Sequence, residues 1–214
     1  MVKLTKIYTR TGDEGMTGLS DFSRTRKTDP RIEAYADVDE ANSAIGVAVS
    51  LARNEFDDET LKLLSQIQND LFDLGADLSN PLNEHYEYEP LRVDAIWIDA
   101  LEEAIDHYNS QLSKLDSFIL PGGSGLAAGL HLARTVVRRA ERATWHAIET
   151  YGTDPAKKGN HNGGVNVLAA KYLNRLSDLL FVLARYANLK HGGDVKWVPA
   201  ANRRERPEHP TRTE

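Results

Sequence analysis

The sequence predicts an all-α protein, a five-helix bundle preceded by an ordered N-terminal loop. Five long stretches carry apolar residues at helical spacing, and there is little strand signal. Gly, Pro or capping residues separate the five stretches. A chain of 214 residues can bury one sizeable core, and no internal repeat is evident. We therefore expect one bundle domain over residues 1–190, in which residues 1–28 form the loop.

The first three predicted helices follow the loop, whose main strand signal is a short β-like segment at residues 6–9. Asp37 followed by Glu40 resembles a capping box and predicts the start of the first helix. The second helix is expected to stop before Pro81, and the third to start near Asp94. The three apolar stripes are Val38, Ala41, Ile45, Ala48, Val49 and Ala52; Leu61, Leu64, Ile67, Leu71, Leu74 and Leu78; and Trp97, Leu101, Ala104, Ile105, Tyr108, Leu112 and Leu115.

A break followed by a helix cap marks the fourth helix. Residues 118–123 interrupt the helical pattern, and Ser124 can cap the helix that follows. The core face of this helix consists of Leu126, Leu130, Ala133, Val137, Ala140 and Ile148. A polar surface loop at residues 153–164 precedes a fifth helix from about residue 165 to residue 189. Prolines among charged residues predict a flexible tail at residues 191–214.

Composition narrows the classes of function. The net charge of −6 argues against general nucleic-acid binding. The absence of cysteine excludes disulfides, thiolate zinc sites and cysteine nucleophiles. No histidine has the glutamate spacing of a di-iron bundle or a zinc protease, and no apolar run approaches the roughly 20 residues that a bilayer requires. We expect a cytoplasmic protein with no membrane or nucleic-acid partner.

The predicted fourth helix carries a strip of polar and aromatic residues on one face. Its members are Arg134, Arg138, Glu141, Arg142 and Trp145. One interpretation is a solvated face in which Glu141 pairs within the helix. The other is a polyphosphate clamp, because arginine offers fixed bidentate donors to phosphate oxygens. The spacing alone does not decide between them.

The N-terminal loop has the composition of an anion-binding segment. Residues 9–18 contain three glycines, which permit close backbone approach, together with hydroxyl groups and Arg10. Arg24, Arg26 and Lys27 continue the cationic character. The segment is not a Walker A loop, and a mobile glycine-rich arm is the alternative interpretation.

Two further patterns leave the function open. The predicted fifth helix is unusually polar at residues 174–178, where Asn174 either joins a polar network between helices or binds a ligand. Residues 123–125 with Ala128 match a dinucleotide-binding fingerprint, but the strand–helix–strand unit and the ribose-binding acid are missing. We interpret these glycines as a tight turn before a helix.

Three separated blocks of sequence together resemble the PduO-type ATP:cob(I)alamin adenosyltransferases. The resemblance extends to about Leu189, and the order and spacing of the blocks make it specific. The blocks are residues 8–15 with 37–43, residues 118–123 leading to 138–142, and residues 174–178. One departure is the 153–164 loop, which is longer than is typical of the family.

The resemblance implies a homotrimer of five-helix bundles with active sites between neighbouring subunits. The residues that match ATP-binding positions of the family are Thr9, Arg10, Thr11, Gly12, Thr17, Gly18, Lys27, Arg138, Arg139, Glu141, Arg142 and Asn174. Arg134 matches an arginine that pairs with the acid at Asp39 across a subunit interface, and these two residues form the expected catalytic set with Arg138. Phe118 matches the aromatic residue against the lower face of the corrin ring, and Ser177 is a second expected cobalamin contact.

The implied reaction transfers the 5′-deoxyadenosyl group of ATP to cob(I)alamin and releases triphosphate. Cobalt is the nucleophile, so neither a protein nucleophile nor a general base is required. Arginines, Lys27, backbone amides and Mg²⁺ are expected to stabilise charge on the leaving group. An apolar side chain at Phe118 is expected to exclude the lower axial ligand, which favours a four-coordinate cobalt that is easier to reduce.

Further partners follow from the same resemblance. A reductase and an adenosylcobalamin-dependent enzyme are expected to supply reduced cobalamin and to receive the product. The alternative function is a non-catalytic bundle that binds a nucleotide or cobalamin as a sensor or carrier.

Overall fold

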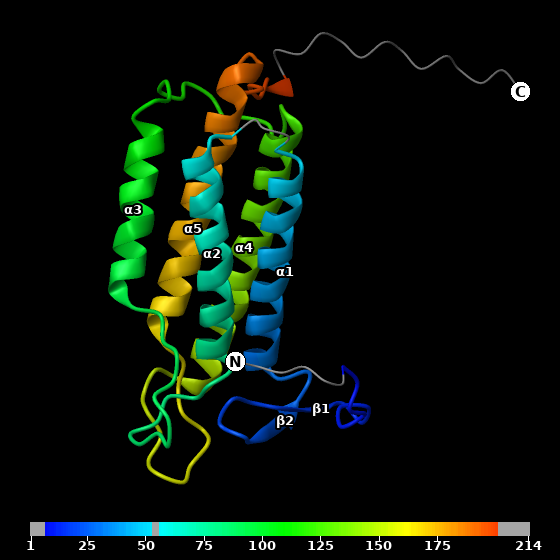
Figure 1. Cartoon of the computed structure of the whole chain (residues 1–214), viewed down its shortest axis with the longest axis vertical. Coiled ribbons are helices and arrows are strands. Elements are labelled where there is room, and N and C mark those ends of the chain that lie inside the picture. Colours follow the sequence, from blue (N-terminus) through cyan, green and yellow to red (C-terminus); the bar gives the residue numbers. More distant parts are fainter. Residues whose placement is uncertain (1–6, 53–55, 201–214) are drawn as a thin grey trace, which may run out of the picture.

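The computed structural model describes residues 7–52 and 56–200 and confirms the bundle of five helices (Figure 1). The helices are α1 (Pro30–Ser50), α2 (Asp58–Leu78), α3 (Ala95–Asn109), α4 (Gly125–Tyr151) and α5 (Val167–Asn188). An antiparallel hairpin of β1 (Met16–Gly18) and β2 (Arg24–Arg26) precedes α1. The short 3-10 helix η1 (Leu189–His191) follows α5.

The helices run along the long axis of the molecule and enclose one core (Figure 1). α1 packs against α2 and α4, α4 packs against α5, and α5 packs against α3. Gly129 lets α1 and α4 approach closely, because a Cβ at this position would lie 2.9 Å from the Cα of Ala48. The apolar stripes predicted for α1, α2 and α4 line this core. Within the described part of the chain, no helix combines the length and apolar character needed to cross a membrane.

Each of the five α-helices begins after a residue whose side chain accepts a hydrogen bond from the first turn. These capping residues are Asp29, Asp57, Asp94, Ser124 and Asn166. The helix starts predicted at Asp94 and Ser124 are confirmed. The capping box predicted at Asp37 is wrong, because α1 already begins at Pro30 with Asp29 as its cap. Proline suits this first helical position, since its missing N–H would have no partner there.

The sequence predicts the end of α2 correctly and the end of α3 incorrectly. α2 ends at Leu78, before Pro81 as predicted. α3 ends at Asn109, so the prediction that its stripe continues to Leu112 and Leu115 is wrong. Beyond Asn109, backbone hydrogen bonds between residues three apart replace the helical pattern and turn the chain toward α4.

The N-terminal loop folds around the β1–β2 hairpin. The described part of the predicted β-like segment, residues 7–9, is not a strand, and the strands form at residues 16–18 and 24–26 instead. The hairpin rests on the bundle where the backbone N–H of Ser20 donates to the carbonyl of Ser79, at 3.0 Å. The loop is therefore attached to the end of α2.

A buried arginine joins four segments at the lower end of the bundle. The Arg31 guanidinium donates to the carbonyl of Leu78 at 3.0 Å and to the carbonyls of Gly163 and Gly164 at 2.8 and 3.3 Å. It also lies 4.8 Å from the ring centroid of Tyr151 in α4. Arg31 is 2% exposed, so these carbonyls have little access to water. The start of α1 thereby fixes the end of α2, the end of α4 and the approach to α5.

A second buried polar cluster fixes the connection between α2 and α3. Asp77 is 1% exposed and forms an ion pair with Arg92. Its carboxylate also accepts hydrogen bonds from the backbone of Val93 at 2.8 Å and from the side chain of Asn166 at 2.7 Å. The start of α5 is thus tied to the segment that leads into α3.

The polar loop at residues 153–164 lies on the surface at the lower end and is anchored there (Figure 1). The backbone of Ala156 donates to the carbonyl of Leu82 at 2.8 Å and accepts from Glu84 at 2.9 Å. Gly163 lies so close to Leu82 that an added Cβ would stand 1.7 Å from the Leu82 carbonyl oxygen. Glycine is therefore required at this contact.

Residues 194–198 depart from the expectation of a flexible tail. This segment runs beside residues 118–120, and the backbone N–H of Trp197 donates to the carbonyl of Phe118 at 2.8 Å. The pairing ties the described end of the chain to the segment before α4. Residues 201–214, the rest of the predicted tail, lie outside the described residues.

We expect Arg31→Met to lower the free energy of unfolding by about 3 kcal/mol, because it leaves buried carbonyl groups without donors. Urea unfolding followed by circular dichroism measures the change. Lys62→Met, which alters an exposed cation on α2, is the control. An unchanged urea midpoint for Arg31→Met would show that the arginine does not hold the lower end together.

We expect Gly163→Ala to destabilise the protein by about 2 kcal/mol or more, because the new methyl group collides with the Leu82 backbone. Gly75→Ala in α2 is the matched control, since an added Cβ there meets no atom within 4 Å. Removing a helical glycine should stabilise the protein by about 0.5–1 kcal/mol. Thermal melts of both variants should therefore shift in opposite directions, and equal shifts would refute the close contact.

Candidate active site

The predicted ATP-binding loop forms a compact unit with the hairpin. The hydroxyl groups of Thr9 and Thr11 are 2.9 Å apart, and Arg24 of β2 donates to the carbonyl of Thr11 at 2.8 Å. Gly12 lies against Lys27, because a Cβ at Gly12 would stand 3.1 Å from the Lys27 Nζ. The structure thus brings an ammonium group, two hydroxyl groups and exposed backbone together. This combination of groups can bind an anion.

The same unit includes the predicted residues Arg10, Thr17 and Gly18. Arg10 has a left-handed backbone with φ of 62°, and its guanidinium lies 5.8 Å from the ring centroid of Tyr8. Thr17 and Gly18 belong to β1. The hydroxyl of Thr25 in β2 donates to Asp29, the cap of α1, at 2.6 Å and attaches the hairpin to α1.

Arg134 and Arg138 occupy the face of α4 that borders α5. The Arg134 guanidinium lies 6.0 Å from the ring centroid of Phe181 in α5, and its Nε is buried with no hydrogen-bond partner among the described residues. Burial, followed by the positive charge of Arg138, lowers the pKa of Arg134. Arg138 is exposed one turn further along α4. Two neighbouring cations therefore stand on a face that favours an anion.

Glu141 and Asn174 meet on this same face. The Asn174 side chain in α5 donates to the Glu141 carboxylate at 3.3 Å. Glu141 is thus paired between helices, in contrast to the intrahelical pairing of the solvated-face interpretation. Ser177 is 3% exposed, and its hydroxyl donates to the carbonyl of Asn174 at 2.9 Å. The Ser177 hydroxyl is therefore bonded to a backbone carbonyl of its own helix, α5.

Arg139 and Arg142 do not share the environment of Arg138. Arg139 points toward α1, where it forms ion pairs with Asp37, at 3.4 Å, and with Glu40. The Glu40 hydrogen bond raises the pKa of Arg139. Arg142 is exposed, and its Nη1 donates to the carbonyl of Arg138 at 3.2 Å.

Asp39 lies on a different side of the bundle from Arg134. It borders a groove of about 650 Å³ between α1 and α2, together with Tyr35, Asn42 and the exposed ring of Phe72. Arg134 lies between α4 and α5. Within one chain the structure does not bring the predicted pair together.

The segment before α4, which contains Phe118, and the N-terminal loop lie at opposite ends of the bundle (Figure 1). The Phe118 side chain is 79% exposed, and its ring centroid lies 6.1 Å from that of Trp197. An exposed aromatic ring of this size suits a large apolar ligand. α4 connects the two ends, and Arg134 and Arg138 stand between them.

His131 is a member of the arginine face that the sequence did not single out. It is 2% exposed. Its two ring nitrogens have no hydrogen-bond partner among the described residues, and its ring centroid lies 6.1 Å from that of Phe181. Burial and then the charge of Arg134 lower the pKa of His131. Its position three residues before Arg134, which places both on one side of a helix, could have indicated from the sequence that it belongs to this face.

Known proteins are similar to this chain over most of its length. The chain matches the cobalamin adenosyltransferase family over residues 7–187. A corrinoid adenosyltransferase of Mycobacterium tuberculosis is 56% identical over 202 residues, which cover 94% of this chain and 97% of the relative. A corrinoid adenosyltransferase of Bacillus subtilis is 39% identical over 199 residues, which cover 92% and 94%.

Solved structures give the same result for the fold. A variant of the PduO-type ATP:corrinoid adenosyltransferase from Lactobacillus reuteri, complexed with cobalamin and ATP, superposes with a TM-score of 0.78 at 35% identity. The match covers 90% of this chain and 99% of that one. A second variant, complexed with ATP, has a TM-score of 0.75. The chain belongs to the cobalamin adenosyltransferase family.

Proposed function

We propose that the protein transfers the 5′-deoxyadenosyl group of ATP to cob(I)alamin. Cobalt attacks the ribose C5′ carbon, a cobalt–carbon bond forms, and the bond from C5′ to the triphosphate oxygen breaks. The bond's electron pair leaves with the triphosphate. The observation that carries this proposal is the pair of cations on α4, because the barrier depends on stabilising charge on that leaving group.

The pair differs from Arg139 of the same helix in its partners. Arg139 is already compensated by two carboxylates of α1, whereas Arg138 has no carboxylate partner among the described residues. A cation held by carboxylates would have to break those ion pairs to bind phosphate. We therefore assign the main phosphate contact on α4 to Arg138, with the loop residues 9–12, Thr17, Gly18 and Lys27. Glu141, Arg142 and Asn174 support this contact, whereas Arg139 joins α4 to α1.

We propose that the active site forms between copies of the chain in a homotrimer. Asp39 and Arg134 lie on different sides of one bundle, and the buried Nε of Arg134 has no partner among the described residues. A neighbouring copy could supply the carboxylate that Arg134 lacks. The exposed Phe72 beside Asp39 gives the same surface an apolar contact.

We further propose that Phe118 faces the corrin ring and excludes its lower axial ligand. Its 79% exposure leaves the ring available to a ligand. Ser177 is the weaker candidate for a cobalamin contact, because its side chain is buried.

Mg²⁺ would arrive with the triphosphate. The residues described here contain no group of three or more His, Cys, Asp or Glu side chains able to hold a metal ion, and Mg²⁺ commonly binds through phosphates and waters. The cytoplasmic location, a reductase and an adenosylcobalamin-dependent acceptor enzyme stay predictions of the family resemblance.

Anaerobic incubation with chemically reduced cobalamin, ATP and Mg²⁺ should yield adenosylcobalamin and triphosphate. The absorption spectrum and anion-exchange chromatography measure the two products. Binding of both substrates without either product would favour the sensor or carrier instead.

We expect Arg138→Ala to reduce kcat by at least about 100-fold with the fold retained, which is typical for the loss of one preorganised charge-stabilising donor. Lys62→Ala on α2 is the control for removal of an exposed cation. Near-normal turnover of Arg138→Ala would remove Arg138 from the phosphate site.

Exchanging the charges of Asp39 and Arg134 tests whether the two side chains pair. Asp39→Arg and Arg134→Asp should each weaken the trimer and activity, since each leaves two like charges facing one another. The double variant should recover part of both properties. Sedimentation velocity and the adenosylation assay measure the outcome, and a double variant worse than either single variant would argue against the pair.

A further inference from the structure

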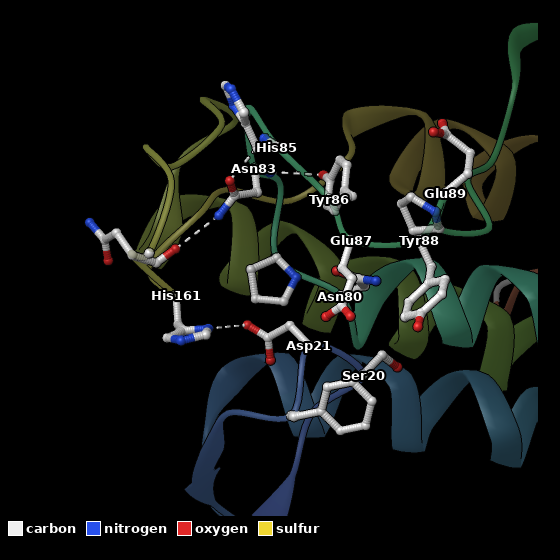
Figure 2. A pocket seen from close by; sticks show the side chains of 15 residues that line it. Ser20, Asp21, Asn80, Asn83, His85, Tyr86, Glu87, Tyr88, Glu89 and His161 are labelled. Carbon is white, nitrogen blue, oxygen red and sulfur yellow. Dashed lines mark hydrogen bonds and ion pairs between the residues drawn. The ribbon is translucent and has the colours of Figure 1, made fainter.

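A cavity of about 320 Å³ lies beside the hairpin at the lower end of the bundle (Figure 2). It is enclosed by the turn between β1 and β2, the connection after α2 and the 153–164 loop. Asp21 and His161 face one another at its side, and His161 Nδ1 lies 2.7 Å from Asp21 Oδ2. The other titratable side chains that line the cavity are His85, Tyr86, Glu87, Tyr88 and Glu89.

Asp21 organises the turn of the hairpin with one carboxylate oxygen and contacts His161 with the other. Its Oδ1 accepts hydrogen bonds from the backbone N–H and the hydroxyl of Ser23, at 3.0 and 2.6 Å. Between them, Phe22 has a left-handed backbone with φ of 65°, which is rare for a bulky residue. Burial raises the pKa of Asp21, but the hydrogen bonds from Ser23 and His161 lower it by more. The charged carboxylate therefore holds this turn.

His161 projects from a part of the 153–164 loop that is fixed on both sides. The preceding carbonyl, of Asn160, accepts from the Asn83 side chain at 3.0 Å (Figure 2). Two residues later, the carbonyl of Gly163 accepts from the buried Arg31 at 2.8 Å. The backbone that carries the imidazole is thus attached to the bundle independently of the hairpin.

The hairpin has further attachments from Ser20 to the end of α2 and from Thr25 of β2 to Asp29, the cap of α1, at 2.6 Å. The contact with His161 attaches it to the 153–164 loop. This contact restrains the turn that directly follows Thr17 and Gly18 of β1. Its loss would let the turn move about the other attachments.

We propose that His161 is a positioning residue for the nucleotide-binding loop, which it holds in place through Asp21. This inference rests on the proposed function, in which Thr17, Gly18 and Lys27 contact ATP. If the hairpin is in its ATP-binding position for a smaller fraction of the time, the apparent affinity for ATP falls in proportion to that fraction. Saturating ATP restores the bound geometry, so the turnover number is conserved.

His161→Ala should raise KM for ATP about 3- to 10-fold with kcat changed less than about 2-fold, the range expected for one partly exposed charge-assisted hydrogen bond. His161→Asn should restore most of the affinity, because the asparagine Nδ2 takes the place of the imidazole Nδ1. His85→Ala is the matched control, a second histidine of the same cavity with no side-chain hydrogen bond among the described residues. It should leave KM unchanged.

A purely structural role for His161 would give a different result. A less stable fold lowers the amount of active enzyme, so kcat would fall while KM stayed constant, and the asparagine variant would not differ from the alanine variant. Either outcome would overturn the proposal.

Two measurements separate this proposal from the proposed function. Calorimetric titration of ATP without cobalamin should show the same loss of affinity in His161→Ala, whether or not the protein turns over. Hydrogen exchange should become faster in residues 16–26 of that variant and stay unchanged in His85→Ala. Unaltered ATP affinity or unaltered exchange in His161→Ala would refute the positioning role, whereas failure of wild-type turnover alone would refute only the reaction.

Discussion

The buried guanidinium of Arg31 is the constraint on which the lower end of the molecule depends. It satisfies carbonyl groups from the end of α2 and from the segment before α5, and it lies on the Tyr151 ring of α4. The hydroxyl of Tyr151 in turn donates to the α1 cap, Asp29, at 2.6 Å. A buried guanidinium is stable only when its N–H groups donate hydrogen bonds. The observed arrangement of these segments brings three carbonyl groups to the Arg31 donors. The N-terminal loop and the 153–164 loop both rest on that arrangement.

In the proposed function, α4 divides its arginines between structural and chemical tasks. Arg139 faces carboxylates of α1 and joins two helices. Arg134 and Arg138 face the other way, where Phe181 offers an aromatic ring and no carboxylate compensates the two guanidinium groups within the described residues. Like charges on adjacent turns repel one another, so this face is more stable with an anion bound. The same helix can therefore stabilise the bundle and hold a triphosphate.

In the proposed function, the positions of the remaining candidates require more than one bundle to make a whole active site. Asp39 borders the groove between α1 and α2. The segment before α4, which contains Phe118, and the N-terminal loop lie at opposite ends of the bundle (Figure 1). A second copy can place the loop and the acid of one chain against the arginine face of another. In the further inference, the anchored 153–164 loop holds the hairpin in place through His161 and Asp21.

The sequence by itself determined the helices, two of their caps and the family. Periodicity reports which side of a helix is apolar, and Ser124 and Asp94 act on backbone within one turn, so these features depend on neighbouring residues. Spacing could also show that Arg138 and Arg139 point in different directions. It could not show which of them meets α1, because that depends on how the helices pack. The start of α1 was missed although Asp29 and Pro30 carry a local signal. Tertiary structure alone decided that Arg31 is buried, since its partners are backbone carbonyls as far away as Gly163, and that residues 194–198 pair with the segment at Phe118. Backbone groups are the same in every residue, and for this reason such contacts leave no trace in the pattern of side chains.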